Sequence, residues 1–343
     1  MAKRVYQVWK GKNVFICQGR LIFGPDAKSL AVTVLLIVLP VVFFCVYVAS
    51  DLVHRFPNEE AGHALTIATI LFSIYVLFIL LRTSSRDPGI VPRSSHPPDE
   101  ELYYDSSTSV DITGRQTPTP RMPRTKEVIV NGLPVKVKYC QTCMLYRPPR
   151  CSHCSVCNNC VERFDHHCPW VGQCIGARNY RFFFLFVSSA AILCIFVMVM
   201  SALNLKFLVS DHKTLWKAMK VSPASISLVA YCFIFLWFVG GLTCFHLYLI
   251  CRNQTTYENF RYGAVNRLNA YDQGCLRNFR DVFCTPAKPS MIDFRSFVQE
   301  ESAVPFARQT RDTDTNRRVK VEDNFEIDND LLKITQRATI ARD

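Results

Sequence analysis

Charged side chains are missing from four long stretches of the 343-residue sequence, at residues 29–50, 64–81, 182–205 and 226–250. Each stretch is mostly apolar, and about 20 such residues cross the hydrocarbon core of a membrane. The sequence therefore predicts four transmembrane helices. His246 is the only His, Asp, Glu, Lys or Arg within them. Its isolation argues against an ion or proton pathway and predicts a hydrogen bond to a neighbouring helix.

Two of these stretches contain residues that alter helix geometry. Pro40 lacks a backbone N–H and predicts a kink in the first helix. Gly240-Gly241 predicts a kink or a close helix contact in the fourth, because small residues let helix backbones approach each other.

A secretory signal is also missing, because the first apolar run is too long and lacks a small-residue cleavage site. Residues 1–28 form a basic and aromatic arm, which is typical either of an interfacial anchor or of a solvated arm. Cysteines at metal-ligand spacing, without a secretory signal, indicate a reducing compartment.

Acidic residues are scarcer than basic ones, 28 against 40, which leaves a net charge of +12. The basic residues are scattered beside the apolar runs and form no stripe with stacking aromatics, so we predict the lipid bilayer and no nucleic acid as partner. Lys and Arg are frequent in 1–28, in 82–181 and from 252 onward, whereas 51–63 holds only Arg55. This bias places both termini and the long middle segment in the cytosol. The lysines of the second short loop are the exception.

Half of the sixteen cysteines lie in residues 139–179, together with three of the eight histidines. A structural zinc ion takes four Cys or His ligands, so two ions would use eight and leave three. Cys140-x-x-Cys143 and Cys154-x-x-Cys157 have the spacing at which both thiolates reach one metal. A His and a Cys from further along would complete each site. The candidate ligands are Cys140, Cys143, Cys151, His153, Cys154, Cys157, Cys160, His166, His167, Cys168 and Cys174.

The run Asp165-His166-His167-Cys168 argues against a purely structural zinc module with spare thiols. In an extended segment His166 and Cys168 share one face, while His167 points away towards a metal. A Cys beside a His, with a carboxylate to orient that His, is typical of a thiolate nucleophile. Asp165 needs a local bend to reach His166.

The stretch 140–179 resembles the DHHC-type cysteine-rich domain of integral-membrane protein S-acyltransferases (palmitoyltransferases), most closely the plant branch. It carries Cys-x-x-Cys, Arg-Pro-Pro-Arg-x-Ser-His-Cys and Asp-His-His-Cys-Pro-Trp-Val-Gly-x-Cys-Ile-Gly. Asp87-Pro88-Gly89, Thr255-Thr256-Tyr257-Glu258 and a C-terminal motif at 266–283, with Tyr271 and Asn278, follow in the family's order. The resemblance covers about residues 1–300.

The resemblance implies two structural zinc sites and one reactive group. One zinc takes Cys140, Cys143, His153 and Cys160, and the other takes Cys154, Cys157, His167 and Cys174. Cys168 is then the nucleophile and His166 its general base, with Asp165 orienting His166.

The implied activity moves a long-chain fatty acyl group, palmitoyl, from acyl-CoA through a thioester on Cys168 to cysteine thiols of membrane-associated proteins. We predict CoA phosphate contacts from five arginines, namely Arg147, Arg150, Arg163, Arg178 and Arg181. The alternative is a non-catalytic or RING-like membrane zinc scaffold. A RING module would need a terminal Cys-x-x-Cys pair, and only single cysteines follow Cys160 in this stretch.

The predicted fold is an α-helical membrane protein with four transmembrane helices and a cytosolic two-zinc domain between helices 2 and 3. The predicted membrane is the plasma membrane or the Golgi and endomembranes. Asn131-Gly132 predicts a hairpin over 128–138, and the linker 94–127 is predicted to lack its own fold. The predicted parts are an N-terminal arm (1–28), helices 1 and 2 (29–81), a linker with the DPG motif (82–138), the zinc domain (139–179), helices 3 and 4 (182–251), the TTxE and C-terminal motif region (252–300) and a disordered tail (301–343).

Overall fold

The structure is a computed structural model that describes residues 2–56, 59–98, 123–262 and 269–298, together with four two-residue strands between 103 and 121. The predicted disordered tail and most of the predicted linker lie outside the described residues. Within the linker, β3 (Tyr103–Tyr104) pairs with β6 (Pro120–Arg121), and β4 (Ser109–Val110) pairs with β5 (Gln116–Thr117). These two pairings, of two residues each, are what the structure describes between 103 and 121.

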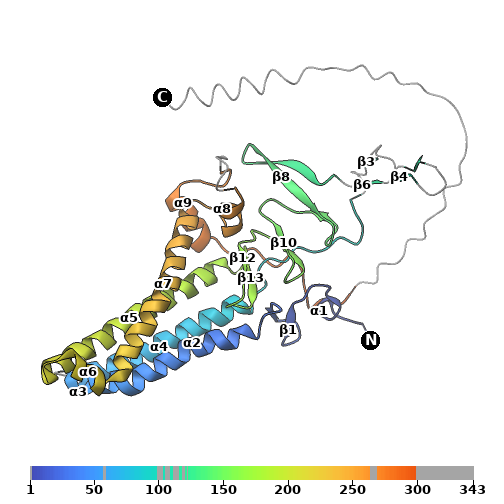
Figure 1. The fold of residues 1–343 in the computed structure, drawn as a ribbon. Helices are drawn as coiled ribbons and strands as arrows, with labels where there is room; N and C mark the ends of the chain where they lie inside the picture. The colour runs from blue at the N-terminus through green and yellow to red at the C-terminus, as the bar shows by residue number, and fades with distance from the viewer. Residues whose placement is uncertain are drawn as a thin grey trace, which may run out of the picture. The chain divides into compact units, whose positions relative to one another are not determined.

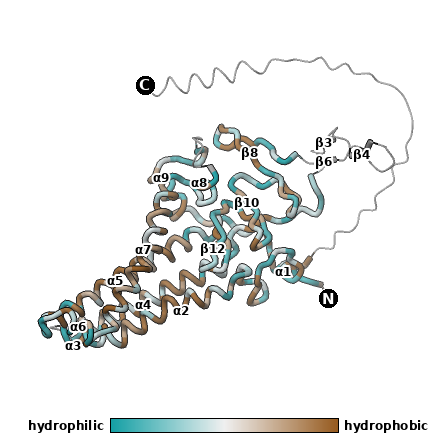
Figure 2. Tube along the Cα trace, viewed as in Figure 1, coloured by the Kyte–Doolittle hydropathy of each residue, from teal (hydrophilic) through white to brown (hydrophobic). Residues whose placement is uncertain are grey.

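Four helical segments are long and apolar enough to cross a membrane, and this part of the prediction is confirmed. The first combines α2 (Ser29–Phe43), a π-helix (Phe44–Ala49) and α3 (Ser50–Arg55). The others are α4 (Glu59–Ser84), α5 (Tyr180–His212) and α7 (Pro223–Cys251). Figure 2 shows these segments as the main hydrophobic part of the chain. All four extend beyond the charge-free runs, because polar end turns also form helix.

Helix α5 packs against both α4 and α7 (Figure 1). The missing N–H of Pro40 leaves the Leu36 carbonyl without its usual helical partner. The Tyr231 hydroxyl, on α7, donates to that carbonyl at 2.7 Å. A neighbouring helix thus supplies the hydrogen bond that the proline removes.

The glycine pair of α7 does not provide the predicted close helix contact. A Cβ at Gly241 would meet nothing within 4 Å, and one at Gly240 would meet only Leu236 of the same helix. Their small size is therefore not needed for packing among the described residues.

The N-terminal arm is folded, which neither alternative from the sequence anticipated. It contains α1 (Val5–Val8) and a hairpin of β1 (Val14–Ile16) and β2 (Leu21–Phe23). The backbone N–H of Val5 donates to the Ser296 carbonyl at 3.0 Å. The rings of Trp9 and Phe15 lie 5.2 and 5.3 Å from the ring of Phe294. Aromatic residues expected at the membrane interface pack instead against a segment near the end of the described chain.

Short hairpins build the cysteine-rich part, at the end of the bundle opposite α3 and α6 (Leu215–Val221). Strands β7 (Thr125–Val130) and β8 (Leu133–Cys140) pair around Asn131-Gly132, whose φ angles of +48° and +79° confirm the predicted hairpin. Strand β9 (Leu145–Tyr146) joins β8, and α8 (Thr256–Tyr262) and α9 (Cys275–Phe283) follow the last span. Two further hairpins are β10 (Ser152–Cys154) with β11 (Asn159–Val161), and β12 (His166–Cys168) with β13 (Gln173–Ile175).

Candidate active site and metal centres

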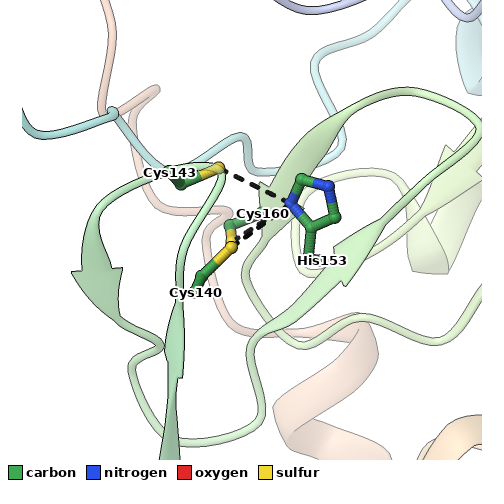
Figure 3. A group of neighbouring side chains, drawn as sticks. All are labelled: Cys140, Cys143, His153 and Cys160. Carbon is green, nitrogen blue, oxygen red and sulfur yellow. Dashed lines mark hydrogen bonds between the residues drawn. The ribbon is translucent and has the colours of Figure 1, made fainter. Parts of the chain in front are cut away.

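The first Cys-His cluster joins a Cys-x-x-Cys pair to the hairpin that follows it. Cys140 ends β8 and Cys143 lies in the next turn, while His153 and Cys160 face each other across β10 and β11. Figure 3 shows the thiols gathered around the imidazole. The sulfur atoms of Cys140 and Cys143 each lie 3.5 Å from His153 Nδ1, and that of Cys160 lies 3.7 Å away.

The second cluster repeats this plan one hairpin later. Cys154 ends β10 and Cys157 lies in the following turn, while His167 and Cys174 are partners across β12 and β13. From His167 Nδ1, the sulfur atoms of Cys157, Cys174 and Cys154 lie at 3.3, 3.6 and 3.9 Å. Each hairpin therefore completes the cluster that the preceding Cys-x-x-Cys pair begins.

Both clusters fit a zinc ion. With Zn–S of about 2.3 Å and Zn–N of about 2.0 Å in a tetrahedron, sulfur and nitrogen are about 3.5 Å apart. The observed separations of 3.3 to 3.9 Å bracket that value. The cysteines of both clusters are buried and the two histidines partly so. The structure thus brings together the eight residues that the sequence grouped, in two closed clusters that could hold zinc.

The second cluster has an outer partner in the N-terminal arm. The far ring nitrogen of His167, Nε2, lies 2.9 Å from Asp26 Oδ2. A carboxylate in this position fixes which imidazole nitrogen faces a metal. The chain is tightly packed there, because a Cβ on Gly172 would lie 2.6 Å from the Asp26 carbonyl oxygen. The sequence contained no signal for this contact.

Asp165, His166 and Cys168 meet beside the second cluster. Strand β12 places His166 and Cys168 on one face and His167 on the other. Asp165 Oδ2 lies 2.6 Å from His166 Nδ1. The local bend that this contact requires is held by the Asp165 N–H, which donates to the Ile175 carbonyl at 2.9 Å. The His166 side chain also interacts with that of Cys168.

The surroundings set the charges of this group. Burial alone would lower the pKa of His166, but hydrogen bonds with Asp165 and Cys168 outweigh burial and raise that pKa to about 9. Burial would raise the pKa of Asp165, yet His166, His246 and the Thr256 N–H hold it below its ordinary value. A protonated His166 next to an ionised Asp165 is an arrangement that stabilises a thiolate.

The Thr255–Glu258 motif, at the start of α8 just after the fourth span, holds Asp165. Thr256 donates its N–H to Asp165 Oδ1 at 2.9 Å and its hydroxyl to Oδ2 at 2.8 Å. Glu258 accepts from the Thr255 N–H at 2.9 Å and pairs with Arg150 at 2.7 Å. Sequence reasoning did not predict the contact with Asp165. The only local signal was a capping pattern, which reports helix geometry and no distant partner.

His246 also lies at this site. The predicted bond to a neighbouring helix is confirmed, since the Tyr180 hydroxyl lies 3.0 Å from His246 Nδ1. The position beside the reactive group was not predicted: a polar atom from each of Asp165, His166 and His246 lies within 4.8 Å of the others. The Phe183 ring lies 5.2 Å from His166 and 5.0 Å from His246. The third and fourth spans thus form one wall of the site.

The turn after Cys168 is fastened to the first two spans. The Thr33 hydroxyl donates to the Trp170 carbonyl at 2.7 Å, and the Ser84 hydroxyl donates to the Val171 carbonyl at 2.8 Å. Cys168 itself is 7% exposed and packs in the same core cluster as the helices. The reactive thiol therefore lies where the cysteine-rich domain meets the bundle.

The C-terminal motif braces the same region. Asn278 donates its side-chain amide to the Cys251 carbonyl at 2.8 Å, and Asn253 donates to the Tyr271 carbonyl at 2.8 Å. The guanidinium of Arg150 lies 4.4 Å from the Tyr271 ring. These contacts link the end of α7 to the residues that hold Glu258.

The five arginines singled out for CoA do not form one group. Arg147 and Arg150 line a cavity of 610 Å³ between β8 and the end of α7. Arg163 is partly buried and donates to Asn253 Oδ1 at 3.2 Å. Burial, reinforced by the charge of Arg150, lowers the pKa of Arg163 to about 10.

The other two arginines lie at a different place. Arg178 pairs with Asp87 at 2.6 Å, and the Arg181 guanidinium lies 4.9 Å from the Phe182 ring. Asp87 also accepts from the N–H groups of Gly89 and Ile90, both at 2.9 Å, so the DPG motif forms a turn that binds Arg178. Only Arg147 and Arg150 therefore share a cavity.

Comparison with known proteins agrees with this site. The family model for the DHHC palmitoyltransferase domain matches residues 135–263. Protein S-acyltransferase 8 of Arabidopsis thaliana is 59% identical, over 98% of this chain and 85% of that protein. Probable protein S-acyltransferases 9 and 7 of the same plant are 57% and 56% identical, over 98% and 88% of this chain and 83% and 68% of their own lengths. The chain belongs to the DHHC family of protein S-acyltransferases and is a multi-pass membrane enzyme of the palmitoyltransferase type.

Proposed function

We propose that the protein transfers a long-chain fatty acyl group, palmitoyl, from acyl-CoA through a thioester on Cys168 to cysteine thiols of membrane-associated proteins. The observation that carries the proposal is the 2.6 Å contact between Asp165 and His166, together with the interaction of His166 with Cys168, which lies outside both metal clusters. Membership of an acyltransferase family decides against the RING-like and scaffold alternatives.

In the first half-reaction, Cys168 gives its proton to His166 and its sulfur attacks the thioester carbonyl. The bond between that carbonyl and the CoA sulfur breaks, and the CoA thiolate takes the proton from His166. In the second half-reaction, His166 accepts the proton of a protein thiol, which attacks the acyl-enzyme and releases Cys168. Asp165 keeps the proton-accepting nitrogen of His166 directed towards sulfur.

Two structural zinc ions would be held by the two cysteine-rich clusters and would stiffen the hairpins that carry the reactive group. The clusters offer each ion four protein ligands, so neither ion would contact the substrate. For CoA, Arg147 and Arg150 are the best placed of the five arginines because they share one cavity. Arg150 has already formed an ion pair with Glu258, so Arg147 carries the freer charge.

Within this proposal, the protein is of the plant-like branch and resides in the plasma membrane, the Golgi or the endomembranes. Both termini and the cysteine-rich domain face the cytosol. The Lys and Arg distribution supports this orientation. Cys168 lies a short segment before the third span, which puts the nucleophile at the cytosolic membrane face. In this proposal the functional parts follow the order predicted from the sequence, with the candidate zinc ligands of 139–179 between the second and third spans.

The test is covalent labelling of the purified full-length protein with a labelled fatty acyl-CoA. Label should enter in a bond that neutral hydroxylamine cleaves, and Cys168→Ser should abolish both labelling and transfer to a partner protein. His166→Ala should slow labelling by about 10² to 10⁴ because it removes the general base. If a zinc-replete Cys168→Ser protein acylates a partner at the wild-type rate, the mechanism is wrong.

A further inference from the structure

A second cavity lies on a different part of the molecule from the reactive group. It has a volume of 390 Å³ and is lined by the N-terminal hairpin, the end of α4, the DPG turn and the segment 290–295. Its described lining shares no residue with the 610 Å³ cavity and does not include Asp165, His166 or Cys168.

Arginines from four parts of the chain converge on this cavity, against two aspartates. The lining arginines are Arg20, Arg82, Arg86, Arg178 and Arg295. Asp87 is already committed to Arg178 at 2.6 Å, and Asp293 lies on the exposed C-terminal segment, where it accepts from the Arg295 backbone. Folding has therefore gathered positive charge here that the nearby carboxylates do not balance.

Four of the five guanidinium groups, those of Arg20, Arg82, Arg86 and Arg295, have no ion-pair partner among residues 2–56, 59–98, 123–262 and 269–298, whereas Arg178 pairs with Asp87. The Nε of Arg86 is also buried without a hydrogen-bond partner in these ranges. Burial lowers the pKa of Arg86, and the charges of Arg178, Arg82 and Arg181 lower it further. These positive charges therefore repel one another, and a bound anion would offset that repulsion.

The cavity lies where two spans end. The charge-free run of α4 ends at Leu81, and that of α5 begins at Phe182. The guanidinium groups of Arg82, Arg86 and Arg181 lie 5.5, 5.2 and 4.9 Å from the Phe182 ring. Arginines stacked on an aromatic ring at a span boundary lie at the depth of lipid headgroups.

We infer that this arginine pocket binds a phosphate group, as carried by an anionic lipid headgroup or by a soluble phosphate. Planar guanidinium groups match phosphate oxygens in pairs, and the five that line this cavity outnumber its two carboxylates, Asp87 and Asp293. The site goes beyond acyl transfer, because its lining includes neither the residues proposed for Cys168 chemistry nor Arg147 and Arg150, the two arginines best placed for CoA.

The test uses the full chain, purified in nanodiscs of phosphatidylcholine with or without phosphatidic acid. Native mass spectrometry measures retained phosphatidic acid, and a parallel titration of phosphatidylcholine nanodiscs with inorganic phosphate measures the soluble form. The double variant Arg82→Gln with Arg86→Gln should bind the phosphate probe about 25-fold more weakly, which corresponds to about 1 kcal/mol for each charge removed. Replacing both by Lys should restore most of the binding, since charge is kept.

Arg280→Gln is the matched control, because Arg280 is an exposed arginine on α9 outside the cavity. Zinc content should be unchanged in every variant, which shows that the fold is intact. Retention of phosphatidic acid that inorganic phosphate does not displace would identify the lipid as the source, and saturation by inorganic phosphate would identify the soluble form. Equal binding by wild type and the double variant, equal loss in Arg280→Gln, or displacement by coenzyme A alone would overturn the inference.

Discussion

The hydroxyl of Thr256 is predicted to set the rate of acyl-enzyme formation without touching sulfur. Asp165 receives three hydrogen bonds through its carboxylate, from His166 at 2.6 Å and from the N–H and hydroxyl of Thr256 at 2.9 and 2.8 Å. The Asp165 side chain is fully buried, so a lost bond cannot be replaced freely by water. Thr256→Val removes the hydroxyl alone and keeps both the shape and the backbone donor.

A hydrogen bond to a buried charged group contributes about 1.5 to 3 kcal/mol. If that amount is lost from the transition state, labelling slows by about tenfold to 150-fold. We expect the lower end, because the Thr256 N–H still holds Asp165. The loss should appear in the rate constant for labelling at saturating acyl-CoA, because Thr256 orients the base and contacts no CoA.

The assay is single-turnover labelling by a fatty acyl-CoA, with zinc measured in the same sample. Thr256→Ser is the matched control, since it keeps the hydroxyl and should label at close to the wild-type rate. Wild-type labelling by Thr256→Val would refute the reasoning. Equal slowing in Thr256→Ser would also refute it, because the methyl group rather than the hydroxyl would then be responsible.

Three further predictions concern the metal sites and the topology. Metal analysis should give two zinc ions per chain. The Cys140→Ala variant should lose zinc and unfold, because zinc binding contributes about 10 to 16 kcal/mol of free energy in small domains. The Cys168→Ser variant should keep both ions. Asp26→Asn should release zinc to a chelator about 10 to 100 times faster by weakening the outer support of His167; wild-type release would mean that the 2.9 Å contact does not support the metal. In sealed right-side-out vesicles, protease should leave the chain uncut at 121–124, and cleavage there would reverse the proposed orientation.

Local pattern was sufficient for the spans, the hairpin and the two Cys-x-x-Cys pairs. A charge-free run of membrane length needs no partner to be recognised, and Asn131-Gly132 specifies a turn through its own backbone angles. These pairs follow from spacing, because two thiols three residues apart reach one metal wherever the segment lies. The resemblance then assigned the remaining His and Cys, and the hairpins bring those residues to the clusters.

Tertiary structure alone decided how the reactive group is held. The Thr256 contact to Asp165 crosses 91 positions of sequence, and the Asp26 contact to His167 crosses 141. The arginines near Phe182 likewise come together only when the spans pack. Such contacts depend on where whole helices and the folded arm end in space, and no local propensity encodes that position. The sequence by itself determined which groups can react or bind metal, while packing determined which side chains orient them and where unbalanced charge collects.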